Sequence, residues 1–279
     1  VMLYKMDLLC IDEKLFSVVN IRMNLEQFSP TARQRKTIRR VENRFTVTYG
    51  HAQPNANKEA LYAQHKQRFK GFIHNTLTEY LSAGFQGTVF DTREVCVYDG
   101  ERLIAVSYFD LGDQSMASLL GLYDEAYAKY SLGTYTLLKE AEYGLRTGRK
   151  WFYPGYILDQ RSGFDYKLKL GAMEHYTANK RWAKLENFKP HTTTSFHIRK
   201  ATEALTEGLS QRGLTSKTWL YPYFSMGYMG PWSAFFLRLP VPVELGHDVE
   251  GMLVAGFDPE TQGYTLMHIH PCPDASQFL

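Results

Sequence analysis

The chain has 279 residues, a formal net charge of +3, three cysteines and 44% hydrophobic residues. This length suits about two domains, and the composition is that of a globular protein with a hydrophobic core, which excludes a disordered chain and a disulfide scaffold. No apolar run approaches the ~18 residues of a membrane span and no signal-peptide pattern opens the chain, so the expected location is the cytoplasm and no membrane partner is expected.

The first elements surround a strongly basic segment. Residues 15–23 are predicted to form a strand and residues 45–49 a second one. Between them, residues 33–44 carry six basic residues and one acidic residue. On a helix, the apolar residues of this segment would face a core and leave a basic face able to bind phosphates, although an ordinary solvated surface is the alternative reading. The outward basic residues are Arg35, Lys36 and Arg39.

Helices, a hairpin and a strand–helix–strand unit are expected in the middle of the chain. In chain order the predicted ranges are 59–69 and 75–82 for helices, 94–99 and 103–111 for the hairpin, 115–124 for a strand, 131–147 for a helix and 151–158 for a last strand. The last helix should begin with Ser131 as its N-cap and end before Gly148. Its crossover between the two strands should be right-handed.

This order of elements resembles the GNAT acyltransferases. The fold class that we expect is α+β (α/β), with a GNAT-like mixed sheet, flanking helices and a β-rich C-terminal extension. Three regions follow: an N-terminal region with the basic segment over residues 1–50, a GNAT-like acyltransferase domain over 51–188, and the extension over 189–279. The extension should hold a helix at 198–209. Its strand-like segments are 218–224, 234–245, 251–257 and 263–270.

Neither acetyl-coenzyme A nor a metal is expected. GNAT members that use acetyl-coenzyme A carry Arg/Gln-x-x-Gly-x-Gly/Ala before the helix, and its backbone N–H groups bind the pyrophosphate. The loop at 130–135 lacks the basic or Gln first position and the second small residue, and the bulky Tyr135 would crowd a phosphate. His268, His270 and Cys272 alternate along one predicted strand, but three ligands without a fourth make a poor metal site.

Polar residues follow the predicted strand at 151–158. Ligands of α/β sheets bind beyond the carboxyl ends of strands, so Asp165, Tyr166 and Lys167 stand where chemistry can occur. A surface loop with ordinary charges is the alternative.

Two blocks of residues resemble the aminoacyl-tRNA–protein transferases, the family of the arginyl-transferases of eukaryotes and bacteria and of the bacterial leucyl-transferases. The first block, residues 28–40 (FSPTARQRKTIRR), is similar to the family's Phe-x-Pro-Ser-x-Ser-Gln-Arg-Arg segment, with Thr31 and Arg33 in place of its serines. The second is similar to its Tyr-Asp-Pro, Ser-Leu-Gly-x-Tyr, Tyr-x-Gly-Tyr-x-Ile and Tyr-Lys signatures. It consists of Tyr123-Asp124, 131–135, Glu140, 153–157, Tyr166-Lys167, Glu174 and Trp182. The resemblance covers roughly residues 15–188, and the ordered set is more specific than any single motif.

This resemblance implies an enzyme that moves an amino acid, of the arginine or leucine class, from aminoacyl-tRNA to the N-terminal amine of an acceptor protein that starts with Asp or Glu. Its donor substrate would be the aminoacyl-tRNA, and its partners that tRNA and the N-terminus of the acceptor protein or peptide. The family's N-terminal Cys-x-x-Cys cluster has no counterpart beside Cys10, so no metal or iron–sulfur cluster is expected from these residues.

Roles at the site follow from the resemblance and from position. An aminoacyl ester is already activated, so the enzyme must chiefly align it with a neutral amine, and a weak base suffices because the pKa of an α-amine is near 8. Tyr156 and Asp124 are the expected catalytic residues, and Lys167, Arg35 and Tyr166 the expected acceptor-binding residues. The expected tRNA-binding residues are Gln34, Lys36, Arg39 and Arg40. The expected walls of the cleft are Ser131, Gly133, Tyr135 and Gly155.

Two other functions stay open from the sequence. One is a GNAT-like N-acyltransferase that uses aminoacyl-tRNA or a thioester on a small-molecule or peptide acceptor. The other is a non-catalytic relic that binds tRNA or protein, which would bind tRNA with steep salt dependence and transfer nothing.

Overall fold

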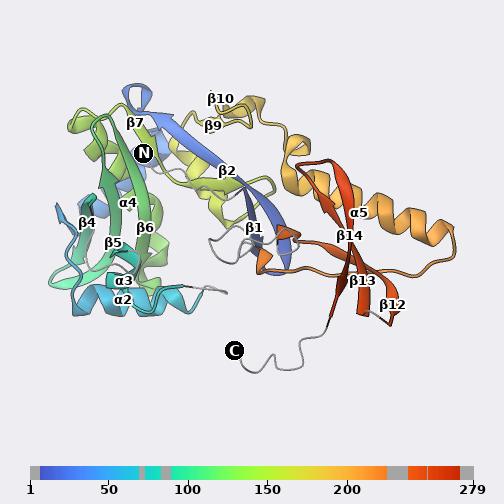
Figure 1. The fold of residues 1–279 in the computed structure, drawn as a ribbon. Coiled ribbons are helices and arrows are strands. Elements are labelled where there is room, and N and C mark those ends of the chain that lie inside the picture. Colours follow the sequence, from blue (N-terminus) through green and yellow to red (C-terminus); the bar gives the residue numbers. More distant parts are fainter. Residues whose placement is uncertain (1–6, 69–72, 83–88, 225–237, 250, 271–279) are drawn as a thin grey trace. The chain divides into compact units, whose positions relative to one another are not determined.

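The computed structural model describes residues 7–68, 73–82, 89–224, 238–249 and 251–270 (Figure 1). The chain forms two compact units: Val19–Phe188 makes up the first, and the described residues of Met6–Val18 and Lys189–Leu279 make up the second. The division after Phe188 falls at the start of the predicted C-terminal extension. The N-terminal region predicted over residues 1–50 is divided between the two units, and its basic helix lies in the first.

A large mixed β-sheet forms the first unit, with the strands in the order β10-β9-β2-β7-β6-β5-β4-β3 and with β8 paired to β2. The strands are β2 (Lys14–Asn24), β3 (Thr46–His51), β4 (Asp91–Asp99), β5 (Arg102–Leu111), β6 (Ser115–Tyr123), β7 (Trp151–Tyr153), β8 (Tyr156–Leu158), β9 (Glu174–Tyr176) and β10 (Trp182–Lys184). The helices are α1 (Ala32–Glu42), α2 (Ala56–Lys66), α3 (Leu77–Ser82) and α4 (Leu132–Arg146). Short 3₁₀ helices are η1 (Leu25–Gln27), η2 (Glu125–Tyr130), η3 (Gly163–Leu170) and η4 (Leu185–Asn187).

The middle of this sheet has the predicted GNAT-like order. Strands β4, β5 and β6 run antiparallel, and Gly100 turns the hairpin between β4 and β5 with φ +61°. After β6 the chain forms α4 and returns as β7, which pairs in parallel with β6. The predicted hairpin, the strand–helix–strand unit and the α+β fold class with a mixed sheet and flanking helices are therefore confirmed.

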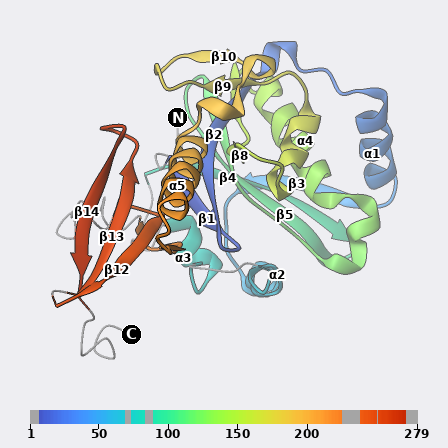
Figure 2. The same ribbon diagram turned by 90° about the vertical axis from the view of Figure 1, so that its right-hand side faces the viewer.

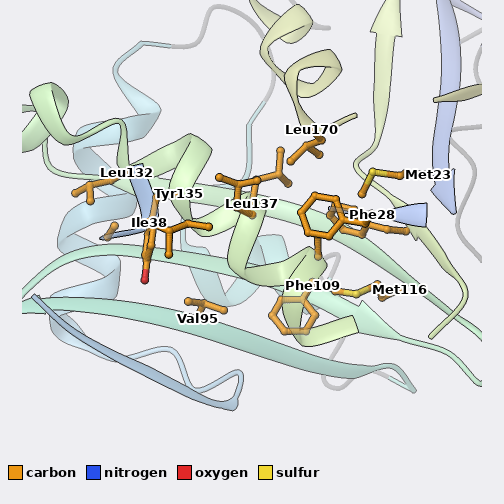
Figure 3. Close-up of a cluster of buried hydrophobic side chains, with 14 of the residues drawn as sticks. Met23, Phe28, Ile38, Val95, Phe109, Met116, Leu132, Tyr135, Leu137 and Leu170 are labelled. Atoms are coloured by element: carbon orange, nitrogen blue, oxygen red, sulfur yellow. The ribbon is translucent and has the colours of Figure 1, made fainter. Parts of the chain in front are cut away.

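Helices cover both faces of the sheet. Figure 2 shows α1 and α4 on one side of β3 to β5 and α2 on the other. The larger core lies under α1 and α4, where Leu132, Leu137 and Ile38 pack against Phe109 and Val95 of the sheet (Figure 3). A smaller core forms between α2, α3 and the opposite face; its buried members include Leu61, Tyr62, Leu77, Val106 and Tyr108. Burying apolar side chains on both faces fixes the sheet as a middle layer.

A glycine lets α4 approach the sheet closely. A β-carbon at Gly144 would collide with Met116 Sδ of β6 and would lie 2.7 Å from Leu25 Cδ1. No larger residue fits there without moving these side chains. The helix ends soon after, and Gly148 adopts φ +75° at the predicted position.

The second unit combines the N-terminal hairpin with the C-terminal region. Strand β1 (Leu8–Ile11) pairs with the first half of β2, and a separate sheet has the order β11-β12-β13-β14. Its elements are α5 (Thr194–Gln211), β11 (Lys217–Thr218), β12 (Pro242–Asp248), β13 (Gly251–Asp258) and β14 (Gly263–Ile269), with the 3₁₀ helix η5 (Pro190–Thr192). The predicted helix and the last two predicted strands are confirmed. The strand predicted at 218–224 is limited to its first residue. Of the strand predicted at 234–245, residues 234–237 lie outside the described part of the chain, and residues 242–245 belong to β12.

A small core holds this unit together. Leu8 and Leu15 from the hairpin pack with Ile198 of α5 and with Phe224. In addition, Ser17 Oγ accepts a hydrogen bond from the backbone N–H of Ser195 at 2.9 Å. None of the helices in the described residues combines the length and apolar character that crossing a lipid bilayer requires.

Candidate active site

The two parallel strands at the centre of the sheet separate after three residue pairs. Ser115–Ala117 pairs with Trp151–Tyr153, but β6 continues to Tyr123 without β7 beside it. Beyond Tyr153 the chain breaks at Gly155, which has φ +101°, and β8 pairs with β2 instead. The predicted single strand at 151–158 is therefore two short strands. Their separation leaves the carboxyl end of β7 open beside β6, the kind of place where α/β sheets bind ligands.

Lys167 lies at this break. Its Nζ atom donates a hydrogen bond to the backbone carbonyl of Tyr156 at 2.9 Å and is 5.1 and 4.9 Å from the ring centroids of Tyr156 and Phe164. A β-carbon at Gly155 would come within 3.1 Å of Nζ, so the glycine leaves the space that the ammonium occupies. The η3 helix that carries Lys167 is anchored by a capping box in which Ser162 and Asp165 exchange hydrogen bonds.

The ammonium of Lys167 is buried without a counter-ion. The residue is 8% exposed, and no carboxylate in the described parts of the chain forms an ion pair with it. Burial lowers its pKa to about 8, so the group is mostly charged at pH 7. An ammonium has three N–H donors, and only one is used by Tyr156. The remaining donors suit an incoming anionic or carbonyl oxygen.

Glu140 is a second buried ionisable group on the sheet side of α4. It is 1% exposed, and burial raises its pKa to about 8, while the nearby hydroxyls of Ser107 and Ser118 act in the opposite direction. Its Oε2 atom has no hydrogen-bond partner among the residues described. At pH 7 this carboxyl is therefore mostly neutral and can donate a proton in a hydrogen bond.

Tyr166 is next to Lys167 in sequence and is influenced by the charge of Glu140. It precedes Lys167 in η3, and its pKa is raised to about 12 by burial, with smaller contributions from Glu140 and Tyr123. The residue as a whole is 39% exposed, so only part of its side chain is removed from water. Helix η3 thus carries a buried cation at the break and, next to it in sequence, a phenol on which the charge of Glu140 acts.

A basic hollow lies at the other end of α4. Its volume is about 330 Å³, and it is lined by α1 and by the chain that enters α4. The lining residues are Arg33, Lys36, Thr37, Arg40, Lys129 and Ser131. Two of the four predicted tRNA-binding residues, Lys36 and Arg40, thus share one cationic surface.

A known protein family matches the part of the chain that contains the break between β7 and β8. The family described as arginine-tRNA-protein transferase, C terminus, matches residues 47–177, which include β3 to β9 and α4. These residues are similar to the aminoacyl-tRNA–protein transferase family. The resemblance noted in the sequence is therefore confirmed, and with it the enzyme class, an aminoacyltransferase.

Relatives with the name aspartate/glutamate leucyltransferase occur in several bacteria. The Leptospira interrogans protein is 24% identical over 180 residues, which are 61% of this chain and 69% of that protein. The Aeromonas hydrophila protein is 31% identical over 108 residues, 39% of this chain and 40% of that protein. The Xanthomonas axonopodis pv. citri protein is 28% identical over 167 residues, 57% of this chain and 66% of that protein.

Two solved structures are similar over half of the chain. L-PGS from Bacillus licheniformis has a TM-score of 0.38 and 14% identity, covering 50% of this chain and 46% of that chain. The GCN5-related N-acetyltransferase from Kribbella flavida has a TM-score of 0.29 and 13% identity, covering 50% of this chain and 48% of that chain.

The remaining residues predicted for the transferase site lie apart from the break or have other partners. Asp124 caps η2, where its carboxylate accepts hydrogen bonds from the Ala126 N–H at 3.0 Å and from Arg102 at 2.6 Å. Arg35 is exposed on α1 and donates to the Pro30 carbonyl. The side chain of Tyr156 lies beside Phe164, with ring centroids 5.2 Å apart. Of the acceptor-binding and catalytic predictions, the fold thus gathers Tyr156, Tyr166 and Lys167.

Gln34 has a structural role in the transferase unit. It is buried at the start of α1, where it shares a capping box with Thr31. Its Nε2 atom donates to the carbonyl of Lys169 at 2.6 Å and to that of Leu170 at 3.3 Å, which ties α1 to the end of η3. At the ~100° per residue of a helix, Arg39 lies roughly 60° around α1 from Lys36 and about 100° from Arg40, and it is not part of the lining of the hollow.

The start of α4 differs from the sequence prediction in two respects. Ser131 takes the predicted N-cap position, but its side chain makes no capping hydrogen bond; it has a left-handed backbone with φ +57° and lines the hollow. Tyr135 does not crowd the loop, because its ring is fully buried among core side chains and its hydroxyl donates to Glu42 at 3.3 Å (Figure 3). Gly133 packs against the ring of Tyr123.

The sequence assigned no site role to two residues of this region, although Glu140 is named within the resemblance. Arg22 lies between two indole rings, 3.6 Å from the Trp151 centroid and 4.3 Å from that of Trp182, and bonds Glu174 at 2.6 Å. Nothing in the sequence pairs a residue of the first strand with these partners. Glu140 did leave a signal, because it falls on the apolar face of the predicted helix.

Proposed function

We propose that this protein transfers an amino acid of the leucine or arginine class from aminoacyl-tRNA to the N-terminal amine of a protein that begins with Asp or Glu. The family match and the names of the bacterial relatives support the reaction. The observation that carries the acceptor preference is Lys167, a buried ammonium without a counter-ion at the break between β7 and β8.

Lys167 receives the side-chain carboxylate of the acceptor. The fold has already removed this ammonium from water, so the acceptor does not have to desolvate it again. A carboxylate placed against it forms a charge-assisted hydrogen bond in surroundings of low polarity, where such bonds are strong. An amide in the same place offers no charge, so Asn and Gln are weaker ligands than Asp and Glu.

The transfer step needs alignment more than strong acid–base catalysis. The neutral α-amine attacks the ester carbonyl, an amide C–N bond forms, and the bond from the carbonyl carbon to the ribose oxygen breaks. The ribose oxygen takes up one proton, and the attacking nitrogen releases one. We assign the relay of this proton to Tyr156 by position, and not to Asp124, whose carboxylate is held by two donors.

Charged tRNA and matched peptides test this function. Purified protein is mixed with tRNA charged with radiolabelled leucine or arginine and with peptides that differ only at the first residue, Asp or Asn. We expect label to move to the Asp peptide, and the charged tRNA that supplies it names the donor. Label on no peptide, with the tRNA intact and charged, would contradict the proposal and favour a small-molecule acceptor or a binding protein.

The role of Lys167 has its own control. Lys167→Met should reduce the preference for Asp over Asn by about 30-fold or more, the effect of losing a buried charge pair worth ~2 kcal/mol. Lys169→Met removes an exposed lysine two residues further along η3 and should keep the preference. An unchanged preference in Lys167→Met would exclude Lys167 as the acceptor site while leaving the transfer activity established.

A further inference from the structure

The basic hollow has one continuous cationic wall from α1. Three of its α1 residues carry a charge or a hydroxyl at positions i, i+3 and i+4, and a fourth follows at i+7, so all four lie on one face of the helix. They are Arg33, Lys36, Thr37 and Arg40. This face is adjacent to the buried one, which Gln34, Ile38 and Val41 occupy.

The cations of the hollow have no protein counter-ion. None of Arg33, Lys36, Arg40 and Lys129 forms an ion pair with a carboxylate in the described ranges, and no acidic residue is part of the lining. Arg40 and Lys129 lie over the ring of the buried Tyr130, 5.6 and 5.4 Å from its centroid. Four like charges around one hollow repel each other, and a bound anion removes this repulsion.

The start of α4 adds to the attraction for an anion. Ser131, which lines the hollow, leads into this 15-residue helix with φ +57°, and its side chain does not cap the N–H groups of the first turn. A helix N-terminus also carries a partial positive charge of about half a unit. The hollow thus combines four side-chain cations with the positive end of a helix, and both attract phosphate groups.

We propose that the hollow binds the terminal 5′-phosphate of the tRNA. This inference rests on the proposed function, because it assumes an aminoacyl-tRNA donor. A terminal phosphate carries a charge of about −1.5 to −2 and three free oxygens, whereas an internal phosphodiester carries a single charge and a ribose on each side. A concave site with four cations therefore suits the terminal group better.

The position of the hollow agrees with this ligand. The 5′ and 3′ ends of a tRNA lie at the same end of the molecule, and the amino acid is attached to the 3′ end. Ser131 precedes the first turn of α4, and Glu140, whose charge acts on Tyr166 of η3, lies about 13 Å further along the helix at 1.5 Å per residue. A 5′-phosphate held in the hollow therefore directs the 3′ end toward the break between β7 and β8.

Equilibrium binding of uncharged tRNA tests the proposal without the transfer reaction. One transcript is prepared with its 5′-phosphate and one after phosphatase treatment, and the affinity of each is measured across a salt series. We expect wild-type protein to bind the phosphorylated form about tenfold more tightly. Arg40→Ala should reduce this preference to near unity and lower the slope of log K against log salt by about one unit.

Arg39→Ala is the matched variant. It removes the same charge from a residue of the same helix that does not line the hollow, and we expect it to keep the preference for the phosphorylated tRNA whatever it does to the overall affinity. Equal binding of the two tRNAs by wild-type protein, with a loss of affinity in Arg40→Ala, would assign the hollow to internal phosphodiesters and overturn the proposal.

Two further outcomes would show that the hollow has another ligand or none. Arg40→Ala and Arg39→Ala with identical effects would exclude the hollow as a 5′-phosphate site. Competition by free inorganic phosphate or coenzyme A, without any preference between the two tRNAs, would assign it to a small phosphorylated ligand and also overturn the proposal. Absence of transfer to any peptide would contradict the proposed function, but the binding comparison would still decide the role of the hollow.

Discussion

Lys167 is a cation that the fold keeps in an unfavourable place. Its folded-state pKa of about 8 lies below its ordinary value of 10.5, so the unfolded chain holds the proton more strongly. Between about pH 8 and pH 10.5 the unfolded state binds more protons, and the free energy of unfolding therefore rises with pH across that window. Below pH 8 the full penalty of burying the charge is present.

Lys167→Met should therefore stabilise the protein. Removing the buried charge is expected to raise the free energy of unfolding by about 1–3 kcal/mol at pH 7, after the loss of one hydrogen bond to the Tyr156 carbonyl. The gain should shrink by pH 10, where wild-type Lys167 is neutral when folded. Thermal unfolding at both pH values measures this, and a gain that does not depend on pH would rule out the buried charge as its cause.

Glu140→Gln should show the opposite pH dependence. Because burial raises the folded-state pKa of Glu140 from 4.5 to about 8, its protonated form stabilises wild-type protein below about pH 4.5, and this contribution is lost as the pH rises toward 8. The neutral glutamine should be nearly equivalent at pH 5 and stabilising by about 1–3 kcal/mol at pH 8.5. Equal effects at the two pH values, measured by urea unfolding, would mean that Glu140 does not titrate in this range.

At the scale of elements, the position of α1 depends on one polar side chain. Gln34 completes the N-terminal cap of α1 and also binds two carbonyls at the end of η3, the helix that carries Lys167. The buried amide of Gln34 thus links α1, which lines the basic hollow, to η3, which carries Lys167 at the break. A change at Gln34 should affect the folding of this region before it affects any contact with RNA.

Gln34→Ala is expected to lower the free energy of unfolding by about 1–3 kcal/mol, since it leaves a cap and two carbonyls without their partner. It should leave the salt slope of tRNA binding unchanged, because the amide carries no charge. Chemical denaturation and the salt series give the two readouts. Full stability with a reduced tRNA affinity would instead support the direct contact with tRNA that the sequence predicts.

Periodicity was enough to predict most of the central elements, but not the break. The hairpin around Gly100 and helix α4 leave regular patterns of apolar residues, and both were predictable within a few positions. Pro154 and Gly155 are turn formers, but they stand inside an aromatic run whose β-prone residues predicted one continuous strand. The direction of Tyr135 was also hidden, because it depends on which elements pack against α4.

The candidate site was predictable only in part for the same reason. Lys167 and Tyr166 follow a strand, and strand ends are where ligands bind, so position alone indicated them. That Lys167 is buried without a counter-ion depends on Gly155 and Phe164, which only the folded chain brings to its ammonium. Which residues of the basic segment line the hollow, enter the core or stay on the remaining surface of α1 likewise depends on how this helix packs against the rest of the unit.

At the scale of the whole molecule, the two units are interleaved in sequence. Strand β2 belongs to both, since its first half lies with β1 in the second unit and its second half in the large sheet of the first. The apolar side chains of Leu8 and Leu15 are buried by Ile198 and Phe224. The C-terminal unit therefore includes the N-terminal hairpin.

Removal of residues 189–279 alone should produce an aggregation-prone protein, because Leu8 and Leu15 lose the apolar partners that cover them. Removal of residues 1–18 together with 189–279 should give a more soluble protein, since both halves of that core are then absent. Size-exclusion chromatography of the two truncated proteins compares them. A soluble, monomeric product from the first deletion would show that this core does not protect the hairpin.

The same interleaving sets an order of assembly on the ribosome. Leu8 and Leu15 leave the exit tunnel first, but Ile198 and Phe224 follow some 180 residues later. At a synthesis rate of about 5–20 residues per second, the N-terminal hairpin waits roughly 10–40 s for its partners. The large sheet can form during that interval, so the transferase unit is complete while the apolar hairpin is still uncovered and open to chaperones.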